Sequence, residues 1–376
     1  MKHKALRKAV RIFAEAEMSP IAHDIDRDAA FPWNVAEKMR PLNFFGLQAP
    51  KIFGGAEMDS LSYAIVIEEI SRVSAAMGLC LTVHNSLAVY PIVRYGTDEQ
   101  KKRFLPDMIK GEKIGTFCMT ETSVGSDAAG VETHATLEGG AYVLNGTKIF
   151  ITNASICGTA LVFATTDYQN PRSGSVLFIV ERDTPGFIVG EKEDLCGMRA
   201  NPISTIFFEN CHVPEKNMVG HPGEGIRICL EAVDAGRIGI AAQAIGIAQA
   251  ALEASVRYSK ERRQFQKPLA SFQTIQNYLA DMATDIDAGR LLLYRACEAM
   301  DSGYSFASEA AMAKLFCSEM ATRVANKAVQ IHGGYGYSKE YDVERYFRDA
   351  KATEIYEGTS EVQRIVISRA VLSKRV

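Results

Sequence analysis

The spacing of apolar residues changes twice along this chain of 376 residues, and that change limits the folds it can adopt. Up to about residue 112, apolar residues recur at helical spacing, as at Leu6, Val10 and Phe13. From about 113 to 222, short segments rich in β-branched and aromatic residues alternate with turn sequences such as Asn145-Gly146. After residue 222 the helical spacing returns. The sequence therefore predicts an α+β multidomain protein, with domains at 1–112, 113–222 and 223–376.

The middle region contains eight segments that resemble short strands. They cover residues 114–120, 133–137, 142–144, 148–152, 160–165, 176–180, 187–189 and 205–209. Because they follow one another without intervening helices, they predict an antiparallel sandwich or barrel and not a βαβ sheet. In the third region, helical stretches at 225–260, 272–302, 305–332 and 359–373 predict an antiparallel four-helix bundle. Small residues between 241 and 248 allow its helices to approach closely.

Composition excludes several classes of partner. The chain has 42 basic and 45 acidic residues, a formal net charge of −3, which indicates no binding to nucleic acid or an anionic membrane. No apolar run is expected to reach the length of a membrane span, and the N-terminus lacks the features of a signal peptide. We therefore expect a cytoplasmic protein, or a mitochondrial matrix protein in a eukaryote.

Cysteine and histidine usage gives no sign of a metal site or a disulfide framework. The eight cysteines are scattered, without a C-x-x-C pair, as expected for reduced and mostly buried thiols. The seven histidines show no spacing typical of metal ligands. We expect no bound metal.

A single carboxylate near the C-terminus is a candidate for acid–base chemistry. Glu357 lies between an aromatic residue and a glycine, just before a helix that Thr359 or Ser360 can cap. A carboxylate held beside apolar groups at such a point can be desolvated and act as a base. It can equally do no more than complement the helix dipole. This segment alone favours the second interpretation.

Two segments of the β region combine hydroxyl groups with glycine or aromatic residues. In residues 117–127, a strand leads into a loop whose amides near Gly125 and whose Ser126 hydroxyl can hold a phosphate, or which forms an ordinary polar turn. In residues 148–154, Phe150 and Thr152 are expected on one face of a strand, which suits a flat ring that is both stacked and hydrogen-bonded. An ordinary strand with one polar position explains the second pattern equally well.

Two segments of the helical region also stand out. Residues 262–268 combine paired arginines, an aromatic residue and amides, which suits a pyrophosphate or a solvated helix end. In residues 330–337, paired glycines allow a ligand to approach the backbone, or a sharp helix exit. His332 there is expected to be a packed or surface histidine. No G-x-G-x-x-G follows a strand, so a Rossmann dinucleotide site is not indicated.

Six motifs in this order closely resemble those of the acyl-CoA dehydrogenase family of flavoproteins. They are Thr-Glu-x-x-x-Gly-Ser-Asp at 120–127, Lys-Ile-Phe-Ile-Thr-Asn at 148–153, Asp-Ala-Gly-Arg at 234–237, Arg-x-x-Phe at 262–265, Gln-x-x-Gly-Gly at 330–334 and Tyr-Glu-Gly-Thr at 356–359. Each is weak alone, but all six in register over essentially the whole chain are specific. The resemblance implies an FAD cofactor, an acyl-CoA substrate, electron-transfer flavoprotein as acceptor, and a homotetramer built as a dimer of dimers.

The resemblance also implies which residues contact FAD. One group would lie against the flavin and its pyrophosphate, with Thr152 near N5 and O4: Phe117, Met119, Thr120, Gly125, Ser126, Phe150, Ile151 and Thr152. A second group would reach the adenine half of an FAD bound to a neighbouring subunit: Arg262, Gln264, Phe265, Gln273, Gln330, Gly333 and Gly334. Thr359 and Glu361 would also line the FAD site. Phe150 stands where the family often has Trp, and Thr122 where it often has Pro.

The mechanism implied by the resemblance is α,β-dehydrogenation of the thioester. Glu357 would remove the α-proton while flavin N5 takes the β-hydride, giving a trans-2-enoyl-CoA. Some relatives place the base just before the residue that is here Arg237, but this chain has Gly236 at that position. Glu357 is therefore the candidate base. The residues implied at the substrate are Leu79, Val83, Ser126, Asp234, Arg237, Tyr356 and Gly358.

The motif at 234–239 most resembles the short-chain, butyryl-CoA branch of the family, which implies a role in fatty acid β-oxidation. Leu79 and Val83 would form an apolar pocket floor, and Gly78 replaces the arginine of glutaryl-CoA enzymes, so a short linear acyl group is expected. Branched or alicyclic acyl-CoA is the second choice, because one methylene changes affinity only modestly. An acyl-CoA oxidase that reduces O2 and a flavin-free binding homologue are further alternatives.

Overall fold

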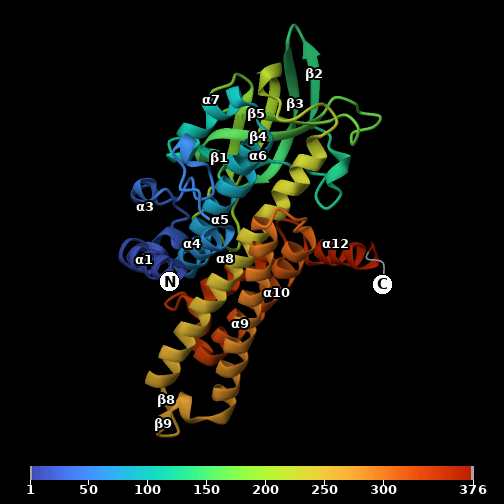
Figure 1. The fold of residues 1–376 in the computed structure, drawn as a ribbon. Coiled ribbons are helices and arrows are strands. Elements are labelled where there is room, and N and C mark those ends of the chain that lie inside the picture. Colours follow the sequence, from blue (N-terminus) through green and yellow to red (C-terminus); the bar gives the residue numbers. More distant parts are fainter. Residues whose placement is uncertain (1, 374–376) are drawn as a thin grey trace.

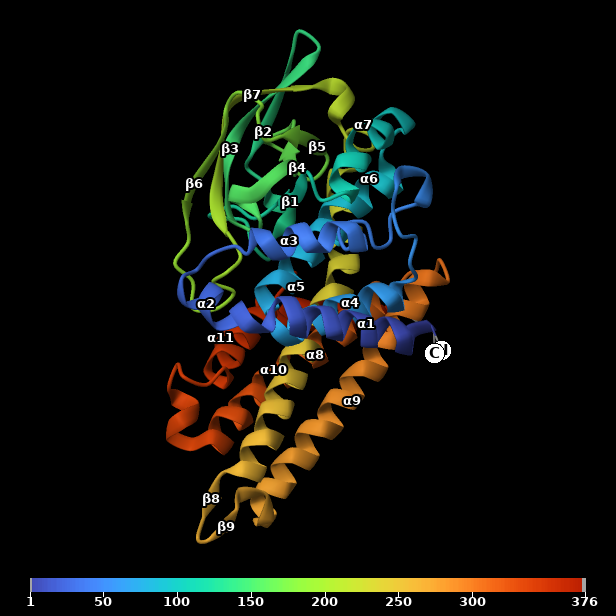
Figure 2. The same ribbon diagram turned by 90° about the vertical axis from the view of Figure 1, so that its left-hand side faces the viewer.

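The computed structural model describes residues 2–373 and confirms the predicted fold class, with helical, β and helical domains in that order (Figure 1). In Figure 2, α1 and α4 of the first domain lie between the sheet above and the long C-terminal helices below. The helices of the N-terminal domain are α1 (Lys2–Glu17), α2 (Ala22–Arg27), α3 (Trp33–Met39), α4 (Ser60–Val73), α5 (Ala75–Thr82), α6 (Tyr90–Tyr95) and α7 (Asp98–Ile109).

Capping residues decide where two of these helices begin. The Asp59 carboxylate accepts a hydrogen bond from the Ser62 amide at 2.7 Å at the start of α4. Thr97 and Gln100 form a reciprocal capping box at the start of α7, with bonds of 3.2 and 2.9 Å. Each cap satisfies amides that the first helical turn leaves free.

A π-helical segment, Val83–Val89, joins α5 to α6 without a break. Such segments are rare and often occur at functional sites. Here the whole segment is buried, and Asn85 and Ser86 hydrogen-bond the carbonyls of Leu81 and Thr82 at 2.9 and 2.6 Å. The sequence analysis did not predict this change of helix type.

The β domain is a seven-stranded sheet in the order β1-β4-β2-β3-β7-β6, with β5 on β4. Most neighbouring strands are antiparallel as predicted, but β1 runs parallel to β4, and His134 forms a parallel bridge with Thr165. A single strand, Ala141–Ile151, replaces the two predicted on either side of Gly146, where the register shifts instead of turning. The other strands are β1 (Ile114–Cys118), β2 (His134–Glu138), β4 (Cys157–Thr165), β5 (Ser175–Glu181), β6 (Phe187–Lys192) and β7 (Ser204–Pro214).

The C-terminal domain is dominated by three long helices: α8 (Gly225–Glu261), α9 (Gln273–Asp301) and α10 (Ala307–His332). Figure 1 shows α8 running from the β domain to the far tip, where the short strands β8 (Arg263–Gln264) and β9 (Lys267–Pro268) lie. A further helix, α11 (Val343–Thr353), was not predicted, although its buried Val343, Tyr346 and Ala350 have helical spacing. The chain then enters α12 (Ser360–Ser373).

Small residues on α8 allow close packing, as predicted. A Cβ added to Gly246 would lie 2.4 Å from the Glu68 carbonyl oxygen of α4. A Cβ at Gly239 would lie 2.4 Å from the Tyr63 hydroxyl of the same helix. A larger residue at Gly246 would force α4 and α8 apart, because it meets the α4 backbone, whereas one at Gly239 would displace the Tyr63 and Thr82 side chains.

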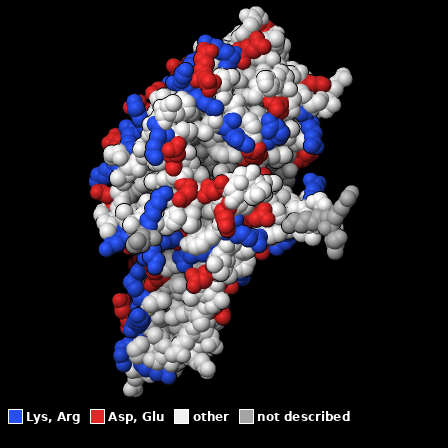
Figure 3. Space-filling model, viewed as in Figure 1, with Lys and Arg blue, Asp and Glu red and all other residues white. Residues whose placement is uncertain are grey.

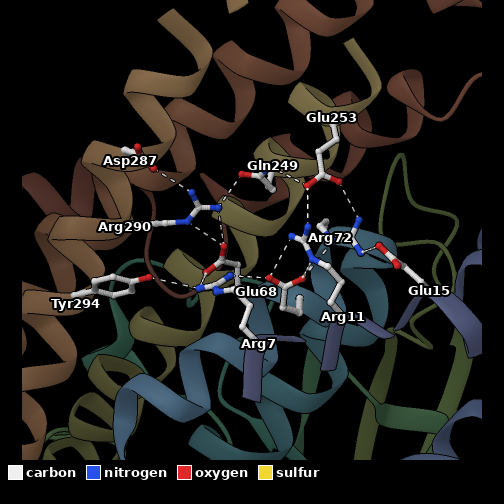
Figure 4. Close-up of polar contacts among 11 residues, drawn as sticks. Arg7, Arg11, Glu15, Glu68, Arg72, Gln249, Glu253, Asp287, Arg290 and Tyr294 are labelled. Carbon is white, nitrogen blue, oxygen red and sulfur yellow. Dashed lines mark hydrogen bonds and ion pairs between the residues drawn. The ribbon is translucent and has the colours of Figure 1, made fainter. Parts of the chain in front are cut away.

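A charge network fastens the N-terminal domain to the long helices (Figure 4). The carboxylates of Glu68 and Glu69 on α4 are almost fully buried. Arg7 from α1 bonds both, at 2.8 and 2.6 Å, and Arg290 from α9 bonds Glu68 at 2.8 Å. Arg72 extends the network to Glu253 of α8 at 3.0 Å. Four helices thus share buried charges that must all be paired in the folded state.

Two helical stretches, Ala75–Tyr95 and Gly225–Glu261, are long and apolar enough to cross a membrane, which the sequence analysis did not expect. In both, most of the apolar window is buried inside the protein, 89% and 78% respectively. Their apolar residues are therefore used for internal packing, as in the core helices of a globular protein.

Candidate active site

A cavity of about 190 Å³ lies where the three domains meet. The N-terminal domain contributes Leu79, Val83 and Leu87, and the C-terminal domain contributes α8 and the segment before α12. The β domain contributes the loop after β1 and the end of β3: Phe117, Met119, Thr120, Gly125, Ser126, Ala128, Phe150, Ile151 and Thr152. One wall therefore carries hydroxyl groups and the opposite wall carries a carboxylate.

The cavity brings together most of the predicted site residues. All eight residues expected against the flavin line it. So do most residues expected at the substrate: Leu79, Val83, Ser126, Arg237, Tyr356, Glu357 and Gly358. Asp234 lies behind this wall, bonded to Arg237 at 2.6 Å. Thr359 and Glu361 do not line the cavity.

Glu357 has an unusual backbone and an unusual environment. Its φ is +56°, in the left-handed region that non-glycine residues rarely adopt. Both carboxylate oxygens are buried, without a hydrogen-bond partner among residues 2–373. Burial raises the pKa of Glu357 to about 8, while the nearby charges of Arg237 and Lys314 oppose this rise. The carboxylate is therefore a stronger base than an exposed one, and it ionises as the pH approaches 8.

Gly236 makes room for this carboxyl group. A Cβ at Gly236 would lie 2.1 Å from a Glu357 carboxylate oxygen. Any side chain at this position would clash with Glu357 as it stands, so Glu357 fills the space that a larger residue 236 would occupy. A larger residue 236 would therefore require the Glu357 carboxylate to move.

Three side chains hold the turn that carries Glu357. Arg237 donates to the Glu357 carbonyl at 3.2 Å, and Lys314 donates to the Gly358 carbonyl at 2.6 Å. Gln363 donates to both carbonyls, at 3.1 and 2.8 Å. The helix start is capped by Thr359, whose hydroxyl accepts from the Val362 amide at 3.3 Å. The turn is thus fixed by donors from three helices.

The neighbouring Tyr356 anchors the same turn to α8 and the N-terminal domain. Its hydroxyl donates to the Gln243 amide oxygen at 2.7 Å. Gln243 in turn donates to the Ala75 carbonyl at 2.7 Å, at the start of α5. Both Gln243 and Ala75 are buried. The chain leading to Glu357 is therefore held on both sides.

A buried ion pair supports the loop after β1. The Lys148 ammonium and the Glu121 carboxylate lie 2.7 Å apart, with both side chains almost fully buried. The same carboxylate accepts from the amides of Glu132 and Thr133 at 2.6 and 2.8 Å. Lys148 also donates to the Met119 carbonyl at 3.2 Å. The motifs at 120–127 and 148–153 are therefore held together by their charged members.

Phe150 and Thr152 both face the cavity, but not for the reason predicted. The pairing of β3 with β7 shifts register between Lys148 and Ile151, and Phe150 has a φ of +54°. This bulge interrupts the simple alternation of strand side chains. Phe150 is 57% exposed, so its ring presents a free face.

A second, more open cavity of about 570 Å³ lies at the far end of α8. Of the residues predicted for the adenine half of FAD, it is lined by Arg262, Gln264, Gly333 and Gly334. Phe265, Gln273 and Gln330 do not line it, and Phe265 projects from the tip with 85% of its surface exposed. His332 is buried and stacks on Tyr258 at 4.2 Å, as expected for a packed histidine.

Several lining residues were missed in the sequence. On α8, Leu230 and Val233 precede Arg237 at helical spacing, and that spacing could have revealed them. Leu87 lies in a fully buried segment and Val362 in a largely exposed helix, and neither apolar residue carries a local signal. Lys314 could have been noticed as the charged member of an otherwise small and apolar helical face: Ala310, Lys314, Cys317, Ala321 and Val324.

Comparison with known proteins identifies the family. The acyl-CoA dehydrogenase N-terminal domain matches residues 1–112, the middle domain matches 116–211 and the C-terminal domain matches 223–372. The chain belongs to the acyl-CoA dehydrogenase family. It is an oxidoreductase of this FAD-dependent family. Among residues 2–373, no group of three or more His, Cys, Asp or Glu residues is placed to hold a metal.

Relatives in this acyl-CoA dehydrogenase family align over nearly the whole chain. An acyl-CoA dehydrogenase of Bacillus subtilis (strain 168) is 46% identical over 98% of this chain and 97% of its own. A 3-(aryl)acrylate reductase of Clostridium sporogenes is also 46% identical, over 98% of each chain. The mitochondrial short-chain specific acyl-CoA dehydrogenase of Homo sapiens is 45% identical over 98% of this chain and 90% of its own.

Solved structures of the acyl-CoA dehydrogenase family superpose closely. Butyryl-CoA dehydrogenase from Megasphaera elsdenii has a TM-score of 0.96 and 41% identity over 98% of both chains. A chain from the structure of the electron transferring flavoprotein of Acidaminococcus fermentans has a TM-score of 0.97 and 43% identity over 99% and 98%. A glutaryl-CoA dehydrogenase from Mycobacterium smegmatis in complex with FADH2 has a TM-score of 0.94 and 30% identity over 100% and 96%.

Proposed function

We propose that this protein removes two hydrogens from a short-chain acyl-CoA to give a trans-2-enoyl-CoA, with Glu357 as the base. The observation that carries the proposal is the buried, unpartnered Glu357 carboxylate facing a cavity with a hydroxyl-lined wall. Relatives named short-chain and butyryl-CoA dehydrogenases support the substrate class. Their identity of 41–45% extends over nearly the whole chain.

The residues of the central cavity fit a flavin. The wall formed by the β domain offers an exposed aromatic ring at Phe150 and hydroxyl groups at Thr120, Ser126 and Thr152. A ring system with several polar edge atoms needs this combination of stacking surface and hydrogen-bonding groups. When bound, the flavin would supply the acceptor for the hydride that leaves the β-carbon.

The residues of the opposite wall would handle the proton. Glu357 accepts the α-proton, and its raised pKa makes it a stronger base than an exposed carboxylate. The Glu357 amide has no backbone or side-chain acceptor among the described residues, so it is free to donate to a thioester carbonyl and to stabilise the developing negative charge. Arg237 and Gln363 keep this amide in place by fixing the next carbonyl.

The lining residues support a small apolar acyl group. Leu79, Val83, Leu230 and Val233 lie on the cavity wall, and no charged residue accompanies them there except Arg237 and Glu357. Arg237 is already paired with Asp234 at 2.6 Å, so a carboxylate at the end of the acyl chain would be buried there without a free cationic partner, at a high free-energy cost. Branched or alicyclic acyl groups of similar size remain the second choice.

A second copy of the chain is needed to complete the cofactor site in this proposal. Arg237 and Tyr258 lie on the same helix, and at 1.5 Å per residue they are separated by about 30 Å along its axis. FAD cannot reach from the central cavity to the distal cavity of the same subunit. The distal cavity, with Arg262 and Gln264, would therefore hold the adenine half of an FAD bound to a neighbouring subunit.

The surface supports the proposed homotetramer. Figure 3 shows charges of both signs interspersed over the upper part of this face, while the lower lobe has its charges mainly along its left edge and tip and is largely uncharged to the right. Several large apolar side chains are exposed on α9 and α12: Leu291, Ile365, Val371 and Leu372. Exposed apolar residues on the outer helices of a bundle are typical of subunit interfaces.

The electron acceptor is proposed to be an electron-transfer flavoprotein. The support is the close match to a chain from the structure of such a flavoprotein of Acidaminococcus fermentans. The cytoplasmic location and the role in fatty acid β-oxidation stay predictions. A flavin-free homologue is disfavoured, because a related enzyme is solved with FADH2 and the cavity residues suit a flavin.

Reduction of an acrylate-type substrate is a second candidate function. The 3-(aryl)acrylate reductase of Clostridium sporogenes is as similar to this chain as the dehydrogenase of Bacillus subtilis. Dehydrogenation and reduction exchange the same proton between Glu357 and the α-carbon. In the reductive direction, Glu357 returns this proton to the α-carbon. Overall similarity therefore does not select the direction.

Anaerobic titration of the holoenzyme with butyryl-CoA tests the main proposal. We expect the flavin absorbance to bleach with butyryl-CoA and more slowly with octanoyl-CoA. Glu357→Gln should retain FAD and abolish bleaching, while near-normal bleaching in this variant would rule out Glu357 as the base. Production of hydrogen peroxide in air would identify an oxidase. Oxidation of the reduced flavin by crotonyl-CoA or by an arylacrylate would measure the reverse direction.

A further inference from the structure

Lys314 on α10 is a fully buried lysine that the mechanism above does not use. Its side chain has no exposed surface, and its hydrogen bond goes to the Gly358 carbonyl at 2.6 Å. A charged ammonium group is rarely buried unless it is paired, because burial removes its hydration. No carboxylate lies within 4.0 Å of the Lys314 ammonium among the described residues, so its position needs another explanation.

Ionisable groups lie near Glu357 on each element packed against it: α8, the segment before the turn, α12, α4 and α10. Arg237 on α8 is neutralised by Asp234 at 2.6 Å. Before the turn, Glu354 pairs with Lys351 at 2.6 Å. On α12, Glu361 lies at the exposed helix start, and on α4 the Tyr63 hydroxyl is buried nearby without a partner. Lys314 is therefore a positive charge close to Glu357 that is not neutralised by an ion pair of its own.

We propose that Lys314 is a positioning residue for the base: it fixes the Glu357-Gly358 turn and stabilises the ionised form of the Glu357 carboxyl group. The inference rests on the proposed role of Glu357. Its geometric basis is the bond to the Gly358 carbonyl, one residue from the base. Arg237 donates to the Glu357 carbonyl in the same turn. Cations from two helices therefore hold the two consecutive carbonyls of the turn.

The direction of the electrostatic effect follows from the two groups. Burial raises the pKa of Glu357 to about 8, and the positive charge of Lys314 opposes that rise. Burial also lowers the pKa of Lys314 to about 8, with Glu357 opposing that fall. Each charged form stabilises the other, so the two groups titrate as a coupled pair. Removing the Lys314 charge should leave Glu357 protonated up to a higher pH.

The test uses Lys314→Gln and Lys314→Met in the FAD-loaded enzyme. Gln keeps a donor for the Gly358 carbonyl without the charge, and Met removes both. The carboxyl stretching band of Glu357 is followed by infrared difference spectroscopy against pH, with Glu357→Gln identifying the band. In both variants we expect its midpoint to rise by about one pH unit or more, and the flavin reduction rate at pH 7 to fall about tenfold or more.

Lys327→Met is the matched control. Lys327 lies on the same helix but pairs with Asp281 at the surface at 2.8 Å, so its loss should leave the band and the reduction rate unchanged. A wild-type midpoint in a folded Lys314→Gln enzyme would overturn the inference, even if its activity fell. The infrared titration does not depend on turnover, so an active Glu357→Gln enzyme would refute the base assignment separately from the role of Lys314.

Discussion

At the scale of single residues, the proposed base combines backbone strain with desolvation. The left-handed backbone of Glu357 costs on the order of 1 kcal/mol or more, and its buried carboxyl group lacks a hydrogen-bond partner among the described residues. Both are maintained because Arg237, Lys314 and Gln363 hold the adjacent carbonyls. A residue selected only for stability would have neither property, which points to a functional reason for both.

The pH dependence of flavin reduction should follow Glu357. Because the base must be ionised and burial raises its pKa to about 8, the rate with butyryl-CoA should increase as pH rises from 6 to 9. Single-turnover stopped-flow measurements at each pH would record it. A rate that falls over the same range would contradict an acid–base role for Glu357.

Glu357→Gln should make the protein more stable at alkaline pH. The folded pKa of Glu357 lies above its unfolded value of about 4.5, so its contribution to stability is fully present below pH 4.5 and is lost as pH rises through 8. At pH 9 the variant should therefore unfold at a higher temperature, and its free energy of unfolding should exceed that of the wild type by up to about 5 kcal/mol. Thermal unfolding at pH 5 and pH 9 would check this. An equal difference at both values would show that ionisation is not the cause.

At the scale of elements, a buried ion pair fixes one loop of the β domain to a neighbouring strand. Glu121 and Lys148 join the loop after β1 to strand β3, and their surroundings exclude water. Such a pair contributes little net stability compared with an apolar pair, but loss of one partner leaves an isolated buried charge. The pair therefore acts mainly to specify how the loop meets the strand.

Lys148→Met should lower both stability and FAD retention. We expect the free energy of unfolding to fall by about 3–5 kcal/mol, because Glu121 is left buried without its partner. The double variant Glu121→Leu with Lys148→Met should recover part of the stability but not the FAD retention, since the loop loses its anchor. Urea unfolding and gel filtration with flavin absorbance would measure the two effects. Lys102→Met, at an exposed position of α7, is the control.

At the scale of the whole molecule, the length of α8 separates the two cavities that we propose to hold the two halves of FAD. The central and distal cavities lie near opposite ends of this helix. The network in Figure 4 keeps the N-terminal domain fixed on the same helix, so the cavity at the domain junction is held by buried charges as well as by apolar packing. The proposed assembly then brings the distal cavity of one copy to the central cavity of another.

Arg262→Ala should weaken FAD binding without changing the central cavity. Arg262 lines the distal cavity. Its neighbour Arg263 does not line this cavity and instead donates a hydrogen bond to the Gln266 carbonyl. We expect Arg262→Ala to lose FAD on dilution at protein concentrations where Arg263→Ala and wild type keep it. Flavin fluorescence released on dilution would measure the loss. Equal retention in the two variants would contradict a role for the distal cavity in cofactor binding.

Local signals were enough for part of the structure. The change from helical to strand periodicity predicted the fold class, and the capping pair Thr97 and Gln100 is a local signal, three residues apart, that marks the start of α7. The eight residues that the motifs predict beside the flavin line one cavity, and their contacts with FAD stay a prediction. These features depend on residues close together in the sequence, or on motifs that occur in this chain in the same order as in the family.

Other features were decided by contacts between distant residues. The sequence by itself determined the order of the domains, because the spacing of apolar residues encodes it, and its short motifs predicted the base and the flavin contacts through a family resemblance. Only the tertiary structure decided that Lys314 reaches Gly358, that Glu121 pairs with Lys148 and that Gly236 makes room for Glu357. The physical reason is that the burial and pairing of charges depend on which helices and strands pack against each other. Short-range sequence patterns carry no information about this packing.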